Sequence, residues 1–349
     1  MTEDNWGLLG NTWAVNLLRG HIQQDGIRHA YLFSGPPGIG KRSLALRFAQ
    51  ALNCPQPPEP GEACRTCRTC QQIEKMQYPD LSVIQAETES RTLKVEQVRN
   101  IQHSLSLKPY QGKYRVALFL RFQETNKEAA NALLKTLEEA PAHAILILTS
   151  DNIEQLFPTV VSRCENLRLH PLPVQSLQSY LLSQDCSLDE ARLLAHLSGG
   201  RVGFAMRLKK DLHYLKERTR WLDEIQVLLS SNRIQRFSYV EMLTKEKKKK
   251  EEVIEFLEAW GTYWQNEIHL ILEIWGTFWR DVMLTCSGSD IPLTNVDRVE
   301  EIKTLAARIT LSQARSLLVG IENAIDRLNK NVNTRLVMEV LMLDWPFKK

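Results

Sequence analysis

The sequence has no long apolar stretch and almost no net charge. None of its 349 residues belongs to an apolar run long enough to span a membrane, which takes about 18 residues. Its first residues, Met1 to Asn5, are polar and acidic, and they lack the charged start and apolar stretch of a signal peptide. We therefore expect a soluble cytoplasmic protein with no membrane partner. A formal net charge of +3 does not by itself indicate nucleic-acid binding.

More than half of the cysteines lie in one segment of the chain. The chain has seven cysteines, an odd number for a disulfide framework, and four of them follow the pattern C-x9-C-x2-C-x2-C. Thiolates two residues apart can reach one tetrahedral ion, which predicts a closed, structural zinc site. Disulfides are the alternative, but a reducing cytoplasm disfavours them. The four predicted ligands are Cys54, Cys64, Cys67 and Cys70.

A phosphate-binding loop is the clearest motif that is present. The segment GPPGIGK runs from Gly35 to Lys41, after the apolar residues Tyr31 to Phe33 and before a helix-forming segment. Gly35, Gly38 and Gly40 permit the turns that point backbone N–H groups at phosphate oxygens, and Lys41 would pair with the outer phosphates. A chance glycine-rich turn is the alternative. We expect a phosphate-binding loop by ancestry, and two states of it stay open: ATP or ADP bound without hydrolysis, or an empty site plugged by Arg42.

The groups that would hold magnesium and activate water are missing. Arg42 stands where this motif has Ser or Thr, and a guanidinium cannot bind a cation. The expected second strand, Val116 to Leu120, runs into Arg121 instead of acidic residues. Glu124 comes too late and is expected to be a solvated loop or cap residue. We therefore predict that hydrolysis at this site is very slow or absent, and that Mg²⁺ binding is doubtful.

The pattern along the chain predicts an α/β domain followed by helices. Short apolar runs at 81–84, 116–120 and 144–149 alternate with helical patterns at about 94–106 and 127–139, which indicates a parallel sheet covered on both faces. The predicted domains are 1–170, with the cysteine module at about 54–70; a small helical domain at 171–208; and an all-α domain at 209–349.

Two features of the helical part allow more than one interpretation. The run KEKKKKEE from Lys245 to Glu252 could be a nucleic-acid patch, but a solvated helix face is the preferred interpretation. Tryptophans at 260, 264, 275 and 279 recur at helical spacing, which favours a packing stripe over base stacking.

Four motifs together resemble the bacterial clamp-loader subunits of DNA polymerase III. They are the loop segment His29–Lys41, the four-cysteine module, AANALLKTLEEAP from Ala129 to Pro141, and FPTVVSRC from Phe157 to Cys164. Two kinds of subunit share these motifs, the ATPase motor (gamma or tau) and the delta-prime stator. Arg42, the acid-free strand end and Gly203, at the place of a nucleotide-sensing arginine, favour the stator kind.

The resemblance implies an AAA+ module, a helical lid and a collar domain that joins five subunits in an open ring. Implied partners are the motor subunits, the delta subunit, the sliding clamp and, through the complex, primer-template DNA. Ser162, Arg163 and Cys164 would lie at a subunit boundary, with Arg163 as an arginine finger in the neighbour's ATP site. The alternatives are an ATP-hydrolysing motor subunit and, in a different class, a zinc-bearing DNA-binding adaptor.

Overall fold

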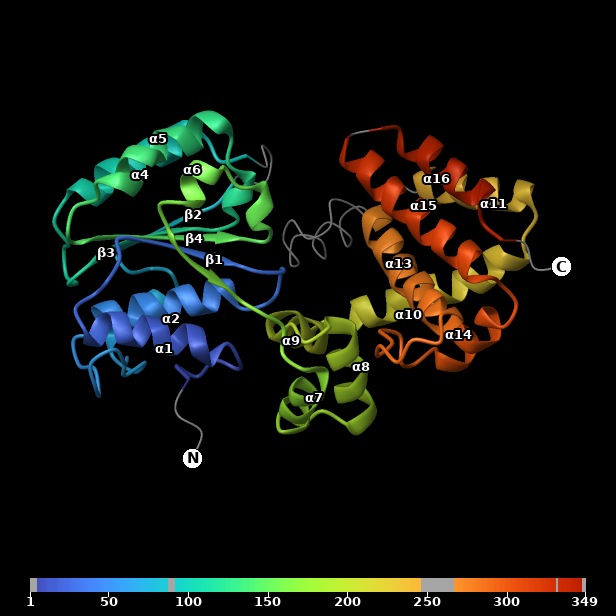
Figure 1. Ribbon diagram of the computed structural model, residues 1–349, viewed down its shortest axis with the longest axis horizontal. Helices are drawn as coiled ribbons and strands as arrows, with labels where there is room; N and C mark the ends of the chain where they lie inside the picture. Colours follow the sequence, from blue (N-terminus) through green and yellow to red (C-terminus); the bar gives the residue numbers. More distant parts are fainter. Residues whose placement is uncertain (1–4, 87–91, 246–266, 331, 347–349) are drawn as a thin grey trace. The chain divides into compact units, whose positions relative to one another are not determined.

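The computed structural model describes residues 5–86, 92–245, 267–330 and 332–346. The chain divides into two compact units, which Figure 1 shows as ribbons. The first unit comprises Met1–Pro173 and Arg201–Phe204, and the second comprises Val174–Gly200 and Ala205–Lys349. The expected lid residues thus belong mostly to the same unit as the expected collar, and the division into three domains stays a prediction.

The first unit is built on a parallel five-stranded sheet with the order β2-β3-β4-β1-β5. This confirms the predicted parallel sheet. The β5 strand was not predicted, because only Leu167 of its four residues is fully buried, as is usual at a polar sheet edge. The strands are β1 (Ala30–Ser34), β2 (Leu81–Ile84), β3 (Arg115–Phe119), β4 (Ala144–Ser150) and β5 (Glu165–Arg168).

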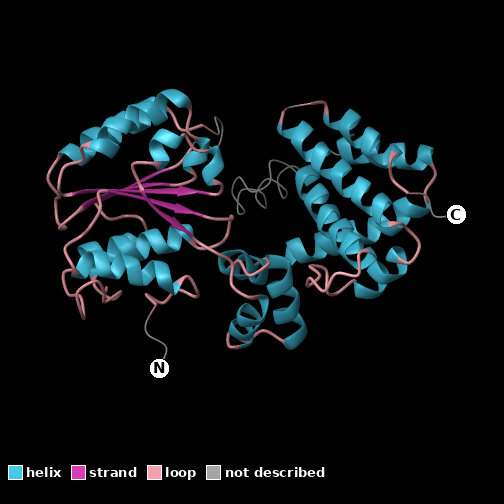
Figure 2. Cartoon of the chain, viewed as in Figure 1, coloured by secondary structure: helices cyan, strands magenta, loops and turns pink. Residues whose placement is uncertain are grey.

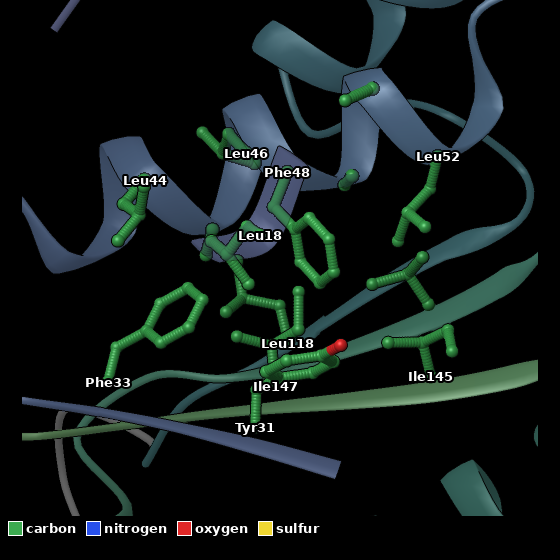
Figure 3. Close-up of a cluster of buried hydrophobic side chains, with 14 of the residues drawn as sticks. Leu18, Tyr31, Phe33, Leu44, Leu46, Phe48, Leu52, Leu118, Ile145 and Ile147 are labelled. Carbon is green, nitrogen blue, oxygen red and sulfur yellow. The ribbon is translucent and has the colours of Figure 1, made fainter. Parts of the chain in front are cut away.

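Helices cover both faces of the sheet (Figure 1). Side chains alternate along each strand, so Tyr31 and Phe33 enter the core under α1 (Thr12–Gln23) and α2 (Lys41–Asn53), as Figure 3 shows. Leu32 enters the core on the opposite face, under α4 (Val95–Ser106) and α5 (Lys127–Glu138). The short helices are α3 (Arg68–Glu74), η1 (Phe122–Glu124), η2 (Ile153–Gln155) and α6 (Pro158–Val161).

The sheet's topology fixes where the functional segments meet. The carboxyl ends of parallel strands lie at one edge of a sheet. Because β4 pairs with both β1 and β3, the loops that follow these three strands are neighbours at that edge. They are the glycine-rich loop after β1, the segment from Leu120 after β3, and the segment from Asp151 after β4.

All the regular elements among the described residues of the second unit are helices, joined by loops (Figure 2). Trp275 and Trp279 are fully buried, as the packing interpretation predicts. Trp260, Trp264 and nearly all of KEKKKKEE lie outside the described residues. Among described helices, none combines the length and apolarity needed to cross a membrane. The helices are α7 (Val174–Leu182), α8 (Leu188–Ser198), α9 (Val202–Lys210, whose first residues belong to the first unit), α10 (Leu212–Ser230), α11 (Arg233–Lys245), α13 (Glu267–Cys286), α14 (Val299–Ala306), α15 (Leu311–Asn329) and α16 (Thr334–Leu343).

Candidate nucleotide loop, metal cluster and arginine site

The glycine-rich loop has the backbone geometry of an anion-binding site. Gly35, Gly38 and Gly40 all have positive φ angles, of 143°, 76° and 110°. The N–H groups of Gly38, Gly40 and Lys41 donate no hydrogen bond to any other described residue. Since α2 begins at Lys41, its partial positive end lies at the same place. The predicted loop therefore retains a set of backbone donors for phosphate oxygens.

The Lys41 ammonium, in contrast, is already occupied. The side chain is only 8% exposed, and Nζ donates to the carbonyl oxygens of Gly35 and of Pro36 (3.0 Å) and to Oδ1 of Asp151 (2.7 Å). An ammonium group has three protons, so these acceptors match its full capacity. Burial lowers the pKa of Lys41, and the charge of Asp151 opposes that shift.

Asp151, the partner of Lys41, is held from the end of the neighbouring strand. Gln123 Nε2 donates to Asp151 Oδ2 (3.0 Å), and the Asp151 backbone N–H donates to Gln123 Oε1 (3.3 Å). Sequence reasoning assigned no role to Asp151 or Gln123. Only the strand order brings them together, because it places the ends of β3 and β4 next to the loop after β1.

The end of β3 carries no acid in the expected position. The strand ends at Phe119, one residue earlier than predicted, and Leu120 and Arg121 follow. The expectation that Glu124 is a solvated loop or cap residue is wrong: it lies inside η1, its side chain is only 19% exposed, and its carboxylate pairs with Arg121 Nε at 3.3 Å. Arg42 is exposed. Apart from the cysteines, the described residues contain no cluster of three or more side chains suited to a metal ion.

The other side of the loop is covered by the start of α9. The Phe204 N–H donates to the Gly38 carbonyl oxygen at 3.2 Å, and the Arg201 guanidinium lies 4.4 Å from the centre of the Phe204 ring. A Cβ atom added at Gly203 would lie 2.9 Å from the Gly38 oxygen. Gly203 therefore allows a close approach of two backbones, and a larger residue there would have to displace the loop.

The four predicted metal ligands do come together. Their sulfur atoms all lie within 4.8 Å of one another, with Sγ–Sγ distances of 3.5 Å for Cys54–Cys64 and 4.0 Å for Cys64–Cys70. A tetrahedral zinc ion about 2.3 Å from each sulfur needs separations of about 3.8 Å. Backbone N–H groups of Cys64, Cys67 and Cys70 donate to cluster sulfurs, each at 3.4 Å. The hydrogen bond from Cys67 lowers the pKa of the Cys64 thiol to about 6, whereas burial raises the pKa of Cys54 and of Cys70.

The Ser-Arg-Cys triplet follows α6. Arg163 is 35% exposed, and its Nε and Nη2 lie 2.7 Å and 2.5 Å from Oε1 of Glu138, while Nη1 donates to the Thr159 carbonyl (2.9 Å). Ser162 Oγ also bonds to Thr159, at 3.3 Å. Burial raises the pKa of Cys164 to about 12, and this side chain packs against the hydrophobic core under α5 and α6. Glu138 is the last residue of α5, within the motif from Ala129 to Pro141. Its pairing with Arg163 was not predicted.

Comparisons with known proteins agree on one family. A family model described as "DNA polymerase III, delta subunit" matches residues 10–173. The chain is 27% identical over 331 residues to DNA polymerase III subunit delta' of Bacillus subtilis, covering 94% of each chain. It is 33% identical over 183 residues to subunit delta' of Pseudomonas aeruginosa, covering 52% of this chain and 55% of that one.

A further relative is DNA polymerase III subunit tau of Salmonella typhimurium. The identity is 34% over 199 residues, which cover 56% of this chain but only 30% of tau. The family model thus spans the loop, the cysteine cluster and the triplet. This chain belongs to the clamp-loader family of DNA polymerase III subunits.

Proposed function

We propose that this chain is a delta-prime-type stator of a bacterial clamp loader, a subunit that does not hydrolyse ATP itself. In this role it helps load the ring-shaped sliding clamp onto primed DNA for replication. It forms a hetero-oligomeric ring with gamma or tau motor subunits and a delta subunit. The similarity to delta' over 94% of both chains supports this role, whereas the similarity to tau covers 30% of that protein.

The observation that carries the proposal is the nucleotide loop without a hydrolytic acid. The two acidic side chains described above at this sheet edge are both engaged, Glu124 with Arg121 and Asp151 with Lys41. Hydrolysis of a phosphoanhydride by this fold needs an acid to hold Mg²⁺ and a group that orients water. Neither of these two described side chains is free for such a role, so we place the chain's contribution to ATP hydrolysis elsewhere on its surface.

Arg163 is the residue that we propose for that contribution. A guanidinium is planar and always charged, and it can form two parallel hydrogen bonds to phosphate oxygens. Its partial exposure and its position after a short helix leave it accessible to a neighbouring subunit. Arginine fingers accelerate phosphoryl transfer by about 10³- to 10⁵-fold. Ser162 and Cys164 would hold the triplet in place through the Thr159 carbonyl and through packing.

Zinc has a structural role in this proposal. All four ligand positions of the cysteine cluster are filled by protein sulfur, so the site has no open position for a substrate. Cys54 is the C-cap of α2, and Gln50 of α2 donates to the Cys70 carbonyl oxygen at 2.7 Å. The ion would thus fix the inserted module to the helix that begins at the nucleotide loop.

The alternative is an ATP-hydrolysing motor subunit, which the identity to tau and the intact loop favour. This alternative predicts Mg²⁺-dependent ATP turnover by the purified chain alone, and loss of that turnover in Lys41→Ala. The stator proposal predicts no such turnover.

The test is DNA-stimulated ATP hydrolysis by a complex of motor subunits, delta and this chain. We expect Arg163→Ala to lower the rate at least tenfold without preventing assembly, because the neighbour's transition state loses a charge. Arg163→Lys should recover little, because an ammonium lacks the planar fork. The control is Arg168→Ala, which removes another exposed arginine. An unchanged rate in assembled Arg163→Ala complexes would refute the proposal that Arg163 acts as an arginine finger.

A further inference from the structure

In the nucleotide loop the backbone N–H groups are available to a ligand, but the lysine side chain is already bound within the protein. Its backbone donors at Gly38, Gly40 and Lys41 are unused by the described residues, as a phosphate site requires. Its only lysine, however, has three acceptors within the protein. The hydrogen bond from Phe204 goes to a carbonyl oxygen of the loop, so it takes none of these donors.

We propose that Asp151 is a specificity-determining residue that excludes nucleoside phosphates from this loop. Its carboxylate takes the place of a phosphate as the counter-ion of Lys41. The proposal goes beyond the stator role, since it concerns the chain's own loop and does not depend on Arg163.

The position of Asp151 is fixed well enough to compete with a ligand. Oδ1 binds Lys41 at 2.7 Å, and Oδ2 accepts from Gln123 at 3.0 Å. The Asp151 N–H donates to the same Gln123 side chain, so hydrogen bonds hold both the backbone and the carboxylate of Asp151. Its side chain is 28% exposed and that of Lys41 is 8% exposed, which leaves little water to screen the pair.

A phosphate entering the loop would face two costs. It would have to separate Lys41 from Asp151, and it would then lie beside an uncompensated carboxylate of the same charge. Like charges at close range in a partly buried site repel far more strongly than in water. Because the backbone donors are intact, removal of this one negative charge should suffice to restore phosphate binding.

The experiment measures binding of fluorescently labelled ADP to the isolated full-length chain, with and without Mg²⁺. We expect Asp151→Asn to bind about tenfold or more tightly than the wild type, with little dependence on Mg²⁺. The double variant Asp151→Asn/Lys41→Met should lose this gain, which would assign the gain to the released ammonium. Glu154→Gln is the matched control, because it removes one exposed negative charge three residues away and should bind like the wild type.

Two results would overturn the inference. One is equal affinity of the wild type and Asp151→Asn for labelled ADP. The other is a gain that survives in the double variant. Asp151→Ser serves as a second variant, with the same expected gain, if Asp151→Asn folds poorly. Since no partner subunit is present, the outcome is independent of the Arg163 experiment, and either proposal can fail alone.

Discussion

At the scale of single residues, the proposed finger is not free in the isolated chain. Two nitrogens of Arg163 contact one oxygen of Glu138, so the guanidinium is partly neutralised by its own subunit. To bind a neighbour's phosphate with full charge, Arg163 has to leave Glu138. Both side chains are partly exposed, and such pairs contribute about 0.2–1 kcal/mol. The pair is therefore a weak resting contact that assembly can replace.

This contact predicts the effect of Glu138→Gln. Loss of the carboxylate should favour the released arginine and raise the ATPase rate of the assembled complex in the absence of DNA by about 1.4-fold to 5-fold, the equivalent of the pair's free energy. Glu139→Gln is a closely matched control, since it makes the same charge change at the adjacent exposed residue. A lower rate in Glu138→Gln alone would mean that Glu138 orients the finger instead of restraining it.

At the scale of elements, the sequence predicts those structural features that depend on a few neighbouring residues. The glycines at 35, 38 and 40, the helix stop at Pro141 and the cysteine spacing each determine local geometry, and the structure agrees with them. The ion pair between Lys41 and Asp151 could not be predicted from the sequence. It depends on β4 lying beside β1, and strand order is a property of the whole sheet. The β5 strand was not predicted because an edge strand shows little apolar pattern in its sequence.

The cysteine module offers a prediction at the same scale. We expect about one zinc ion per purified chain, detected by a colorimetric chelator after thiol modification. Cys54→Ser should lose the ion and make the segment at 55–63 sensitive to limited proteolysis, because this ligand joins the module to α2. Cys286→Ser should keep the ion, since it lies outside the cluster. Disulfides among the four cysteines, with no zinc, would contradict the structural role.

At the scale of the whole molecule, assembly requires a surface that the isolated chain leaves uncovered. Helix α16 has such a surface. Its residues Leu336, Val340 and Leu343 are 58%, 46% and 48% exposed, and their spacing places them on one face of the helix. The opposite face, which includes Met338 and Leu341, is buried in the helical unit. An apolar stripe on a helix that already buries another apolar face is typical of an interface.

The last prediction concerns this stripe. Leu336→Glu/Val340→Glu should abolish assembly with motor and delta subunits in size-exclusion chromatography, because two charges would be buried unpaired at the interface. The free chain should keep its fold, since exposed positions tolerate substitution within about 0.5 kcal/mol, and its zinc content should not change. Val227→Glu, at a 62% exposed position on α10, is the control and should assemble normally. If the double variant assembles fully, the proposed complex must be held by exposed surfaces other than α16.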